Sequence, residues 1–303
     1  MLNFNIRFIT LQIKIIIYNL YKKLIMATLI ADCGATKSEW CLLINGKRKT
    51  LFTQGISPYF LSNEAITALL QKELLPKIKN TTIQKIFFYG TGLGNPAHVK
   101  SMKHILKKLF SNAWIEVNTD MLAAARAMCG NANGIVCILG TGSNSCFYNG
   151  KKIVKNNPSL GYILGDEGSG AYLGKKVLQY YLYQTFDEEL MNSFNKTYAT
   201  DKASIINSVY KNSTPNKYLA SFAKFLSENR GHYMIENIIE DGLNDFFIHH
   251  IYKYRESWLY PIHFTGSIAF AFKNVLKDLC NSFELELGNV AKNPMPGLIQ
   301  YHQ

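Results

Sequence analysis

The chain has 303 residues, of which 48% are hydrophobic and 18% charged. This is enough apolar material for one large domain or two smaller ones, and it excludes a disordered chain and a fibrous repeat. No apolar run reaches the roughly 20 residues of a membrane-spanning helix, so no membrane partner is expected. The six cysteines are scattered without a C-x-x-C pair, which argues against a zinc site or disulfide framework and favours a reducing cytoplasm.

The net charge of +12 comes from lysines spread along the chain rather than from a basic block. We therefore expect no nucleic-acid partner, although the charge is compatible with a polyanionic small molecule.

Residues 1–25 are rich in Ile, Asn, Leu and Lys, and they lack the small-residue cleavage site of a signal peptide. Met26, in contrast, opens an apolar strand pattern. We expect translation to begin at Met26 and residues 1–25 to be a non-native or start-site extension. A membrane-surface helix and an ordinary packed helix are the alternatives.

The pattern from Met26 onward alternates short strands with helices. Asn45-Gly46 between two strand patterns predicts a hairpin turn. In chain order we expect strands at 29–33, 39–44 and 49–53, a helix at 64–79, a strand at 83–89, a helix at 96–110, a strand at 114–118 and a helix from 120 to 128.

The same order then repeats, with Asn149-Gly150 as a second hairpin turn. We expect strands at 135–139, 145–148 and 152–154, a helix at 167–183, almost wholly helical chain over 187–255, a strand at 261–265, a helix at 267–280, a short strand near 283–287 and a tail containing Pro294 and Pro296. The repeat predicts two related α/β lobes, the second enlarged by a helical insertion.

Two turns of small residues follow buried strands at matching points of the two halves, namely residues 32–38 (Asp-Cys-Gly-Ala-Thr-Lys-Ser) and 140–144 (Gly-Thr-Gly-Ser-Asn). Their backbone N–H groups can bind phosphate oxygens, and Asp32 can hold a hydrated Mg²⁺. Either turn alone could be an ordinary hairpin, but together they can clamp a polyphosphate. The segment 170–175 is no Walker loop, because only three residues separate its glycines.

Residues 90–94 (Gly-Thr-Gly-Leu-Gly) resemble a dinucleotide fingerprint, but Asn95-Pro96 interrupts it and hairpins precede it. We interpret this segment as a glycine-rich connection near a ligand.

Three further positions are candidates for the chemistry. Asp120 begins a helix after a strand, so it is either a helix N-cap or a catalytic base. The segment 165–170 (Gly-Asp-Glu-Gly-Ser-Gly) places two acids among glycines before a helix, where they can bind sugar hydroxyls or a metal. Gly266-Ser267 lies between a strand and a helix, where a flat adenine could lie, or where a plain N-cap would serve equally well.

Taken together, these segments resemble the BadF/BadG/BcrA/BcrD ATPase family, and specifically its N-acetylglucosamine kinase branch, within the sugar kinase, Hsp70 and actin superfamily. The resemblance runs in order from Met26 to the end of the chain. It rests on residues 32–38, 119–120, 140–144, 161–169, 266–267 and 297–302.

The resemblance implies two ribonuclease-H-like, actin-like ATPase lobes around a nucleotide cleft: residues 26–118 with 284–303 form the N-terminal lobe, and residues 119–283 the C-terminal lobe. It makes Asp120 the base for the sugar 6-hydroxyl and Asp32 the Mg²⁺ site. The implied ATP and phosphate ligands are Gly34, Ala35, Thr36, Lys37, Thr141, Gly142, Gly266 and Ser267. The implied sugar ligands are Ser57, Asp120, Ser143, Asn144, Gly161 and Asp166.

Two departures from the family pattern concern the sugar. Ser57 stands where relatives often carry an asparagine that binds sugar, and Leu160 matches a tryptophan of animal relatives.

The favoured function is therefore a cytoplasmic, ATP- and Mg²⁺-dependent kinase for an amino sugar, with N-acetylglucosamine preferred and glucosamine and N-acetylmuramate open. A homodimer is compatible with the sequence. The alternative from another class is an actin-like ATPase that regulates a partner protein. Activation of a 2-hydroxyacyl-CoA dehydratase through a shared iron–sulfur cluster is more distant, because Cys129 and Cys280 lack the required pattern.

Overall fold

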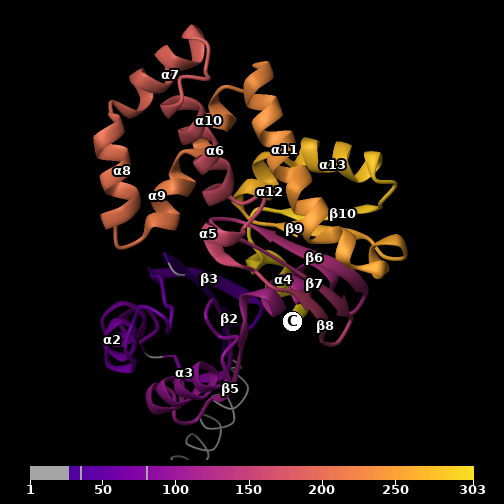
Figure 1. Cartoon of the computed structure of the whole chain (residues 1–303). Coiled ribbons are helices and arrows are strands. Elements are labelled where there is room, and N and C mark those ends of the chain that lie inside the picture. The colour runs from indigo at the N-terminus through magenta and orange to yellow at the C-terminus, as the bar shows by residue number, and fades with distance from the viewer. Residues whose placement is uncertain (1–26, 35, 80) are drawn as a thin grey trace, which may run out of the picture. The chain divides into compact units, whose positions relative to one another are not determined.

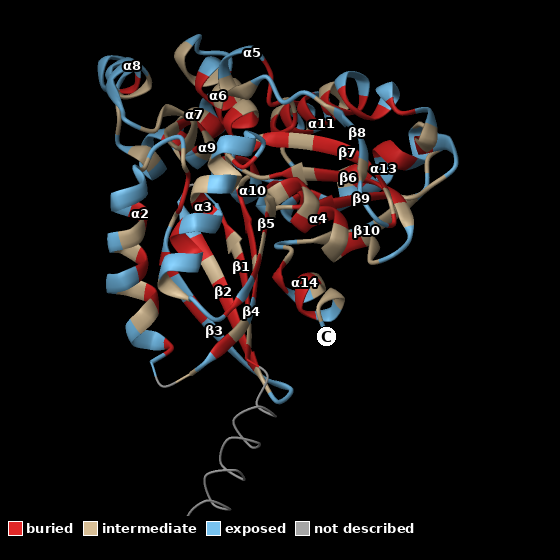
Figure 2. Ribbon diagram, turned by 90° about the horizontal axis from the view of Figure 1, so that it is seen from below, coloured by how far each residue is buried: buried red, intermediate tan, exposed pale blue. Residues whose placement is uncertain are grey.

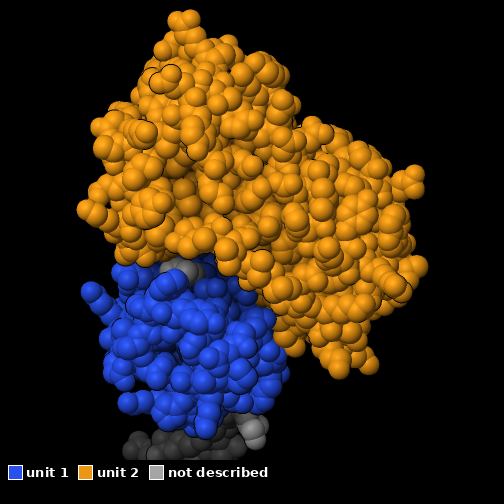
Figure 3. Space-filling view, in the orientation of Figure 1, with its two compact units in different colours: residues 1–120 blue, residues 121–303 orange. Residues whose placement is uncertain are grey.

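A computed structural model describes residues 27–34, 36–79 and 81–303. Contacts divide the chain into unit 1, up to Asp120, and unit 2, from Met121 (Figure 3). The expected start-site extension, residues 1–25, lies outside the described residues. None of the helices in the described ranges is long and apolar enough to cross a membrane.

Unit 1 is built on a five-stranded mixed sheet in the order β3-β2-β1-β4-β5, of which Figure 1 labels β2, β3 and β5. Its strands are β1 (Ala27–Cys33), β2 (Lys37–Ile44), β3 (Lys47–Gln54), β4 (Ile83–Gly90) and β5 (Trp114–Thr119). Its helices are α2 (Asn63–Leu69), continued by the π-helical turn η1 (Leu70–Leu74) and the 3-10 turn η2 (Leu75–Lys77), and α3 (Pro96–Leu109).

Local sequence explains these elements. Asn45 and Gly46 both have positive φ, as a two-residue turn between antiparallel strands requires. The Ser62 side chain caps α2, and the Asn95 side chain caps α3, whose first residue is proline. Alternate residues of the strands pack with the inner faces of α2 and α3 into one core, which includes Leu29, Trp40, Ile66, Phe88 and Ile105.

Unit 2 is built on a second sheet in the order β10-β9-β6-β7-β8. Its strands are β6 (Asn133–Leu139), β7 (Ser143–Asn149), β8 (Ile153–Asn157), β9 (Ile262–Thr265) and β10 (Leu287–Ala291). Its helices are α4 (Asp120–Cys129, which starts at the last residue of unit 1), α5 (Gly161–Leu164), α6 (Gly170–Leu182), α7 (Glu188–Tyr198), α8 (Lys202–Lys211), α9 (Pro215–Ser221), α10 (Ala223–Glu228), α11 (Tyr233–His249), η3 (Ile251–Lys253), η4 (Arg255–Trp258), α12 (Ser267–Ala271), α13 (Lys273–Ser282) and α14 (Met295–Tyr301).

Helices cover both faces of the second sheet. One face packs against α6, α11 and α13, and the other against α4. Buried residues accordingly concentrate in the central strands β6 and β7 (Figure 2). In each unit three consecutive antiparallel strands are followed by two strands that pair in parallel, so the expected pair of related α/β lobes is confirmed. The expected helical insertion is the run from α6 to α11, between β8 and β9.

Four expectations near element ends differ from the structure. The strand expected near 283–287 is β10, four residues later, and the proline-containing tail is the helix α14, because prolines fit a first helical turn. Phe272 interrupts the helix expected over 267–280. The helix expected from residue 167 begins at Gly170, because left-handed backbone at Asp166 and Gly168 delays it.

The structure also groups residues 284–303 differently from the expected N-terminal lobe. Strand β10 pairs in parallel with β9 in the second sheet. A Cβ built on Gly297 of α14 would lie 2.2 Å from the Ala127 carbonyl oxygen of α4. Residues 284–303 therefore lie with unit 2, since both contacts fall within it.

Candidate active site

The carboxyl ends of β1, β4 and β5 form one edge of the sheet in unit 1, and two candidate carboxylates meet there. The strand register places Asp32 beside Tyr89, which in turn lies beside Asn118. Asp120 follows two residues later, as the first residue of α4. Parallel strands thus bring together two aspartates that lie 88 positions apart in the sequence.

Burial, together with the nearby carboxylates of Asp120 and Glu39, raises the pKa of Asp32 to about 7. Concentrated negative charge of this kind is relieved by a cation. Within residues 27–34, 36–79 and 81–303, no three His, Cys, Asp or Glu side chains gather into a metal cage. Mg²⁺ usually takes one or two carboxylates together with phosphates and waters, so the donors around Asp32 fit the implied ion.

The position of Asp120 bears on its two interpretations. Asp120 is the first residue of α4. At this place its carboxylate complements the positive end of the helix dipole, which is compatible with either interpretation.

The first phosphate-turn candidate is tied to the loop that follows β3. The Gly34 amide donates to the Lys37 carbonyl at 3.1 Å, and the amides of Gly55 and Ile56 donate to the carbonyls of Thr36 and Gly34. Carbonyl oxygens repel anions, so engaging them makes the turn more favourable for phosphate. Ala35 lies outside the described residues. The Lys37 ammonium lies over the Phe52 ring, 3.7 Å from its centre.

The same contacts place Ser57 beside this turn, one residue after Ile56. Ser57 is buried, and its carbonyl accepts hydrogen bonds from the amides of Phe60 and Leu61. Tyr59, which is exposed, packs against His98 and against Gly92, where a Cβ would come within 2.9 Å of its ring. The glycine-rich segment 90–94 is therefore a connection that supports the Ser57 loop.

The second phosphate-turn candidate is braced by the start of α6. The amide of Gly170 donates to the Gly140 carbonyl at 2.8 Å, and the amide of Ala171 donates to the Thr141 carbonyl at 3.0 Å. Ser143 is buried, and its hydroxyl has no hydrogen-bond partner. Because an unpaired buried hydroxyl costs free energy, Ser143 indicates a place for a polar ligand.

The segment 165–170, referred to below as the acidic turn, lies against this second turn. Asp166 has a φ of 57°, and its carboxylate accepts from the Ser159 hydroxyl at 2.9 Å. A Cβ on Gly142 would come within 2.8 Å of the same carboxylate, so only glycine fits there without displacing Asp166. Burial raises the pKa of Asp166, while hydrogen bonds from Ser159 and from the Ser143 backbone oppose the shift.

Gly266 lies beside the second turn, at the end of β9. Its φ is 122°, and a Cβ would lie 2.1 Å from the Leu139 carbonyl oxygen, so this position also requires glycine. Ser267, the first residue of α12, is exposed. Thr265, the residue before Gly266, is buried and its hydroxyl has no hydrogen-bond partner. This is a second indication of a polar ligand, at a residue that the sequence did not single out.

The remaining sugar candidates lie nearby in unit 2. The Asn144 side-chain oxygen accepts from the Ser145 amide and from the Asn156 side chain. Gly161, with a φ of 74°, opens α5, and its carbonyl accepts from the Gly165 amide just before Asp166. Unit 1 thus gathers Asp32, Gly34, Thr36, Ser57 and Asp120, and unit 2 gathers Thr141, Gly142, Ser143, Asn144, Gly161, Asp166 and Gly266.

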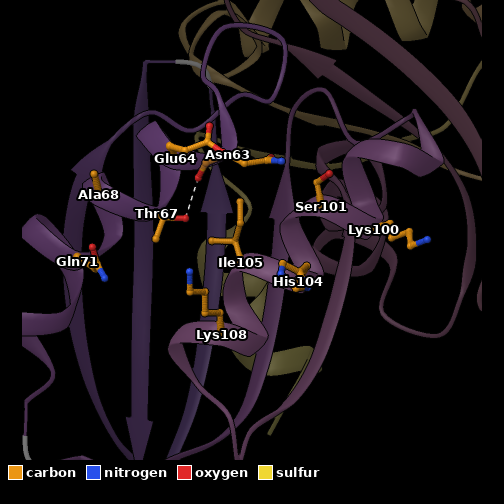
Figure 4. Close-up of a pocket in the computed structure, with 10 residues that line it drawn as sticks. All are labelled: Asn63, Glu64, Thr67, Ala68, Gln71, Lys100, Ser101, His104, Ile105 and Lys108. Carbon is orange, nitrogen blue, oxygen red and sulfur yellow. Dashed lines mark hydrogen bonds between the residues drawn. The ribbon is translucent and has the colours of Figure 1, made fainter.

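A large surface groove of unit 1 lies apart from these residues. It has a volume of about 670 Å³ and runs between α2 and α3, where Thr67, Gln71, His104 and Lys108 line it (Figure 4). It contains none of the candidate residues.

Comparison with known proteins finds similarity to solved structures. No protein-family model and no curated protein matches the chain. Among solved structures, it is similar to a "Putative N-acetylglucosamine Kinase" from Porphyromonas gingivalis, with 39% sequence identity, a TM-score of 0.87, and 91% of this chain and 98% of that one covered.

Two more distant structures show the fold. A "Putative N-acetylglucosamine Kinase" from Chromobacterium violaceum has 16% identity and a TM-score of 0.70, covering 92% of this chain and 99% of that one. MreB 5 of Spiroplasma citri, bound to AMPPNP, has 13% identity and a TM-score of 0.56, covering 91% and 95%. The two α/β units therefore have the actin-like ATPase and sugar kinase fold. At 39% identity over 91% of its length, the chain belongs to the N-acetylglucosamine-kinase-like family of the Porphyromonas protein.

Proposed function

We propose that this protein is an ATP-dependent kinase of the BadF/BadG/BcrA/BcrD type that transfers the γ-phosphoryl group to the 6-hydroxyl of an amino sugar, with N-acetylglucosamine preferred. The observation that carries the proposal is the pairing of Asp32 and Asp120 at one sheet edge, in a chain 39% identical to the Porphyromonas protein. Phosphoryl transfer needs a charge-neutralising centre and a proton acceptor, and these two carboxylates would supply both.

In this proposal Asp120 accepts the proton of the sugar hydroxyl as the new P–O bond forms. Asp32 holds Mg²⁺, which when bound would neutralise phosphate charge. The binding of a divalent cation would also oppose the effect of Asp120 and Glu39 on Asp32 and keep it ionised.

The two glycine turns would bind the polyphosphate. Glycine is required at Gly266, a Cβ at Gly142 would displace the Asp166 carboxylate, and the carbonyls of both turns are already hydrogen-bonded, which favours the approach of an anion. Ser57, Ser143, Asn144, Gly161 and Asp166 would bind and orient the sugar, and Gly266 with Ser267 would lie beside the adenosine.

The proposal is tested by measuring ADP release with ATP and Mg²⁺ over a panel of N-acetylglucosamine, glucosamine and N-acetylmuramate. ADP formation that requires one of these sugars is expected. ADP formation of equal rate without sugar would instead support the alternative, an ATPase whose nucleotide state is recognised by a partner protein.

A further inference from the structure

A chain of buried polar side chains lies behind the acidic turn of unit 2. His250 follows directly after α11, and its Nε2 lies 3.4 Å from Oε2 of Glu167, the residue after Asp166. Its Nδ1 lies 3.2 Å from the Ser145 hydroxyl, which lies 2.9 Å from the Tyr254 hydroxyl. His250, Ser145 and Tyr254 are all at most 5% exposed, so solvent provides no substitute partners.

The hydrogen-bond directions in this chain can be assigned. The Tyr254 oxygen accepts from the Asn157 amide at 2.9 Å, so its own proton is available for Ser145. Ser145 then donates to Nδ1 of His250, and the remaining imidazole proton sits on Nε2, facing Glu167. The opposite tautomer would place a nitrogen lone pair against the Glu167 carboxylate. Burial lowers the pKa of His250 despite Glu167, which agrees with a neutral ring.

His250 therefore contacts two segments at once. Glu167 belongs to the acidic turn that carries Asp166, and Ser145 follows Asn144 in β7. The ring stacks on Phe246, with 4.7 Å between ring centres, and the His250 backbone is held by a hydrogen bond from the Asn157 side chain to its carbonyl. A rigid side chain in this place sets the spacing between β7 and the acidic turn.

We propose that His250 is a positioning residue for sugar binding, which acts through Glu167 and Ser145 on the two segments that carry Asn144 and Asp166. The inference rests on the proposed function, because it assumes that these two segments bind the sugar. His250 itself does not touch the substrate.

The test compares three variants in steady-state assays with N-acetylglucosamine and ATP. His250→Phe keeps the ring and its stacking but removes both hydrogen bonds. His250→Gln keeps an N–H donor for Glu167. His249→Phe is the matched control, since His249 is the exposed preceding residue, the last of α11.

We expect His250→Phe to raise the KM for the sugar about tenfold, the size expected for one lost hydrogen bond to a charged group. The KM for ATP should stay within twofold in the same protein. His250→Gln should recover most of the sugar affinity, and His249→Phe should match the parent.

Several outcomes would overturn the proposal. Equal sugar KM values in His250→Phe and His249→Phe would do so while leaving the kinase function intact. Absence of sugar-dependent turnover in the parent protein would remove the proposed function and this inference together. If His250→Phe does not fold, the test uses His250→Gln and an NMR spectrum of the imidazole nitrogens of the parent protein. A proton on Nδ1 rather than Nε2 would contradict the assigned hydrogen-bond directions.

Discussion

The two units share one strand order but differ in what they place beside their small-residue turns. In unit 1 the turn after β1 adjoins carboxylates, with Asp32 near Asp120 and Glu39. In unit 2 the turn after β6 adjoins the amino end of α6, and the first amides of α6 donate hydrogen bonds to the carbonyls of the turn. The acid of unit 2, Asp166, is itself hydrogen-bonded to Ser159.

This difference separates two tasks that a phosphotransferase must perform. Mutually repelling carboxylates suit ion binding and proton transfer. Hydrogen-bonded turns suit rigid binding. We therefore expect substitution of the carboxylates of unit 1 to lower turnover, and substitution in the glycine turn of unit 2 to lower affinity.

Asp120→Asn should have the largest effect of the substitutions considered, as a loss of turnover. Asparagine preserves size and hydrogen bonding but cannot accept the hydroxyl proton, so kcat should fall by about 10²–10⁴. Steady-state kinetics and a thermal melt measure this. Asp201→Asn is the control, because the Asp201 side chain accepts from the Ser204 amide as a pure N-cap of α8. Near-normal turnover in folded Asp120→Asn would remove Asp120 as the base.

Gly142→Ala should weaken binding in unit 2 with a smaller change in kcat. Its methyl group would come within 2.8 Å of Asp166, whereas a Cβ on Gly140 would meet nothing within 4 Å. We expect Gly142→Ala to weaken ATP and sugar binding about tenfold, which corresponds to about 1.4 kcal/mol of binding free energy. Gly140→Ala should have the smaller effect. Calorimetric titration measures both, and equal effects would contradict the rigid-turn account.

Asp32→Asn should change how stability depends on pH. The folded-state pKa is raised from 3.8 to about 7, so the unfolded chain loses this proton first as pH rises. The stabilising contribution of Asp32 to the free energy of unfolding is therefore fully present below about pH 4 and is lost as pH rises through about 7. Relative to the parent, Asp32→Asn should gain stability as pH rises from about 4 to about 7 in urea unfolding without ligand. Parallel pH profiles would show that Asp32 is not perturbed.

Ser57→Asn should give the smallest effect. Restoring the longer amide at this buried position should shift the KM for the sugar by about 1 kcal/mol, or about fivefold, with the KM for ATP nearly constant. A shift in the KM for ATP alone would place Ser57 outside the sugar pocket.

Local sequence signals were sufficient for much of this fold. Asn45-Gly46 predicts its turn, because only residues that tolerate positive φ form it. The position of β10 could not be predicted in the same way, since it depends on pairing with β9 rather than on its own pattern. His250 and Thr265 could not be predicted for a related reason, since neither lies in a sequence motif. Thr265 is identified by its buried, unpartnered hydroxyl, and His250 by its contact with Glu167, which is distant in the sequence.

The central claim is that ATP is consumed to phosphorylate the 6-hydroxyl of an amino sugar. It is tested most directly by measuring ADP release with N-acetylglucosamine and with its 6-deoxy analogue, at equal ATP and Mg²⁺. We expect rapid ADP release with N-acetylglucosamine, only background release with the analogue, and competitive inhibition of the reaction by the analogue. Equal ADP release with both sugars, or with neither present, would contradict it.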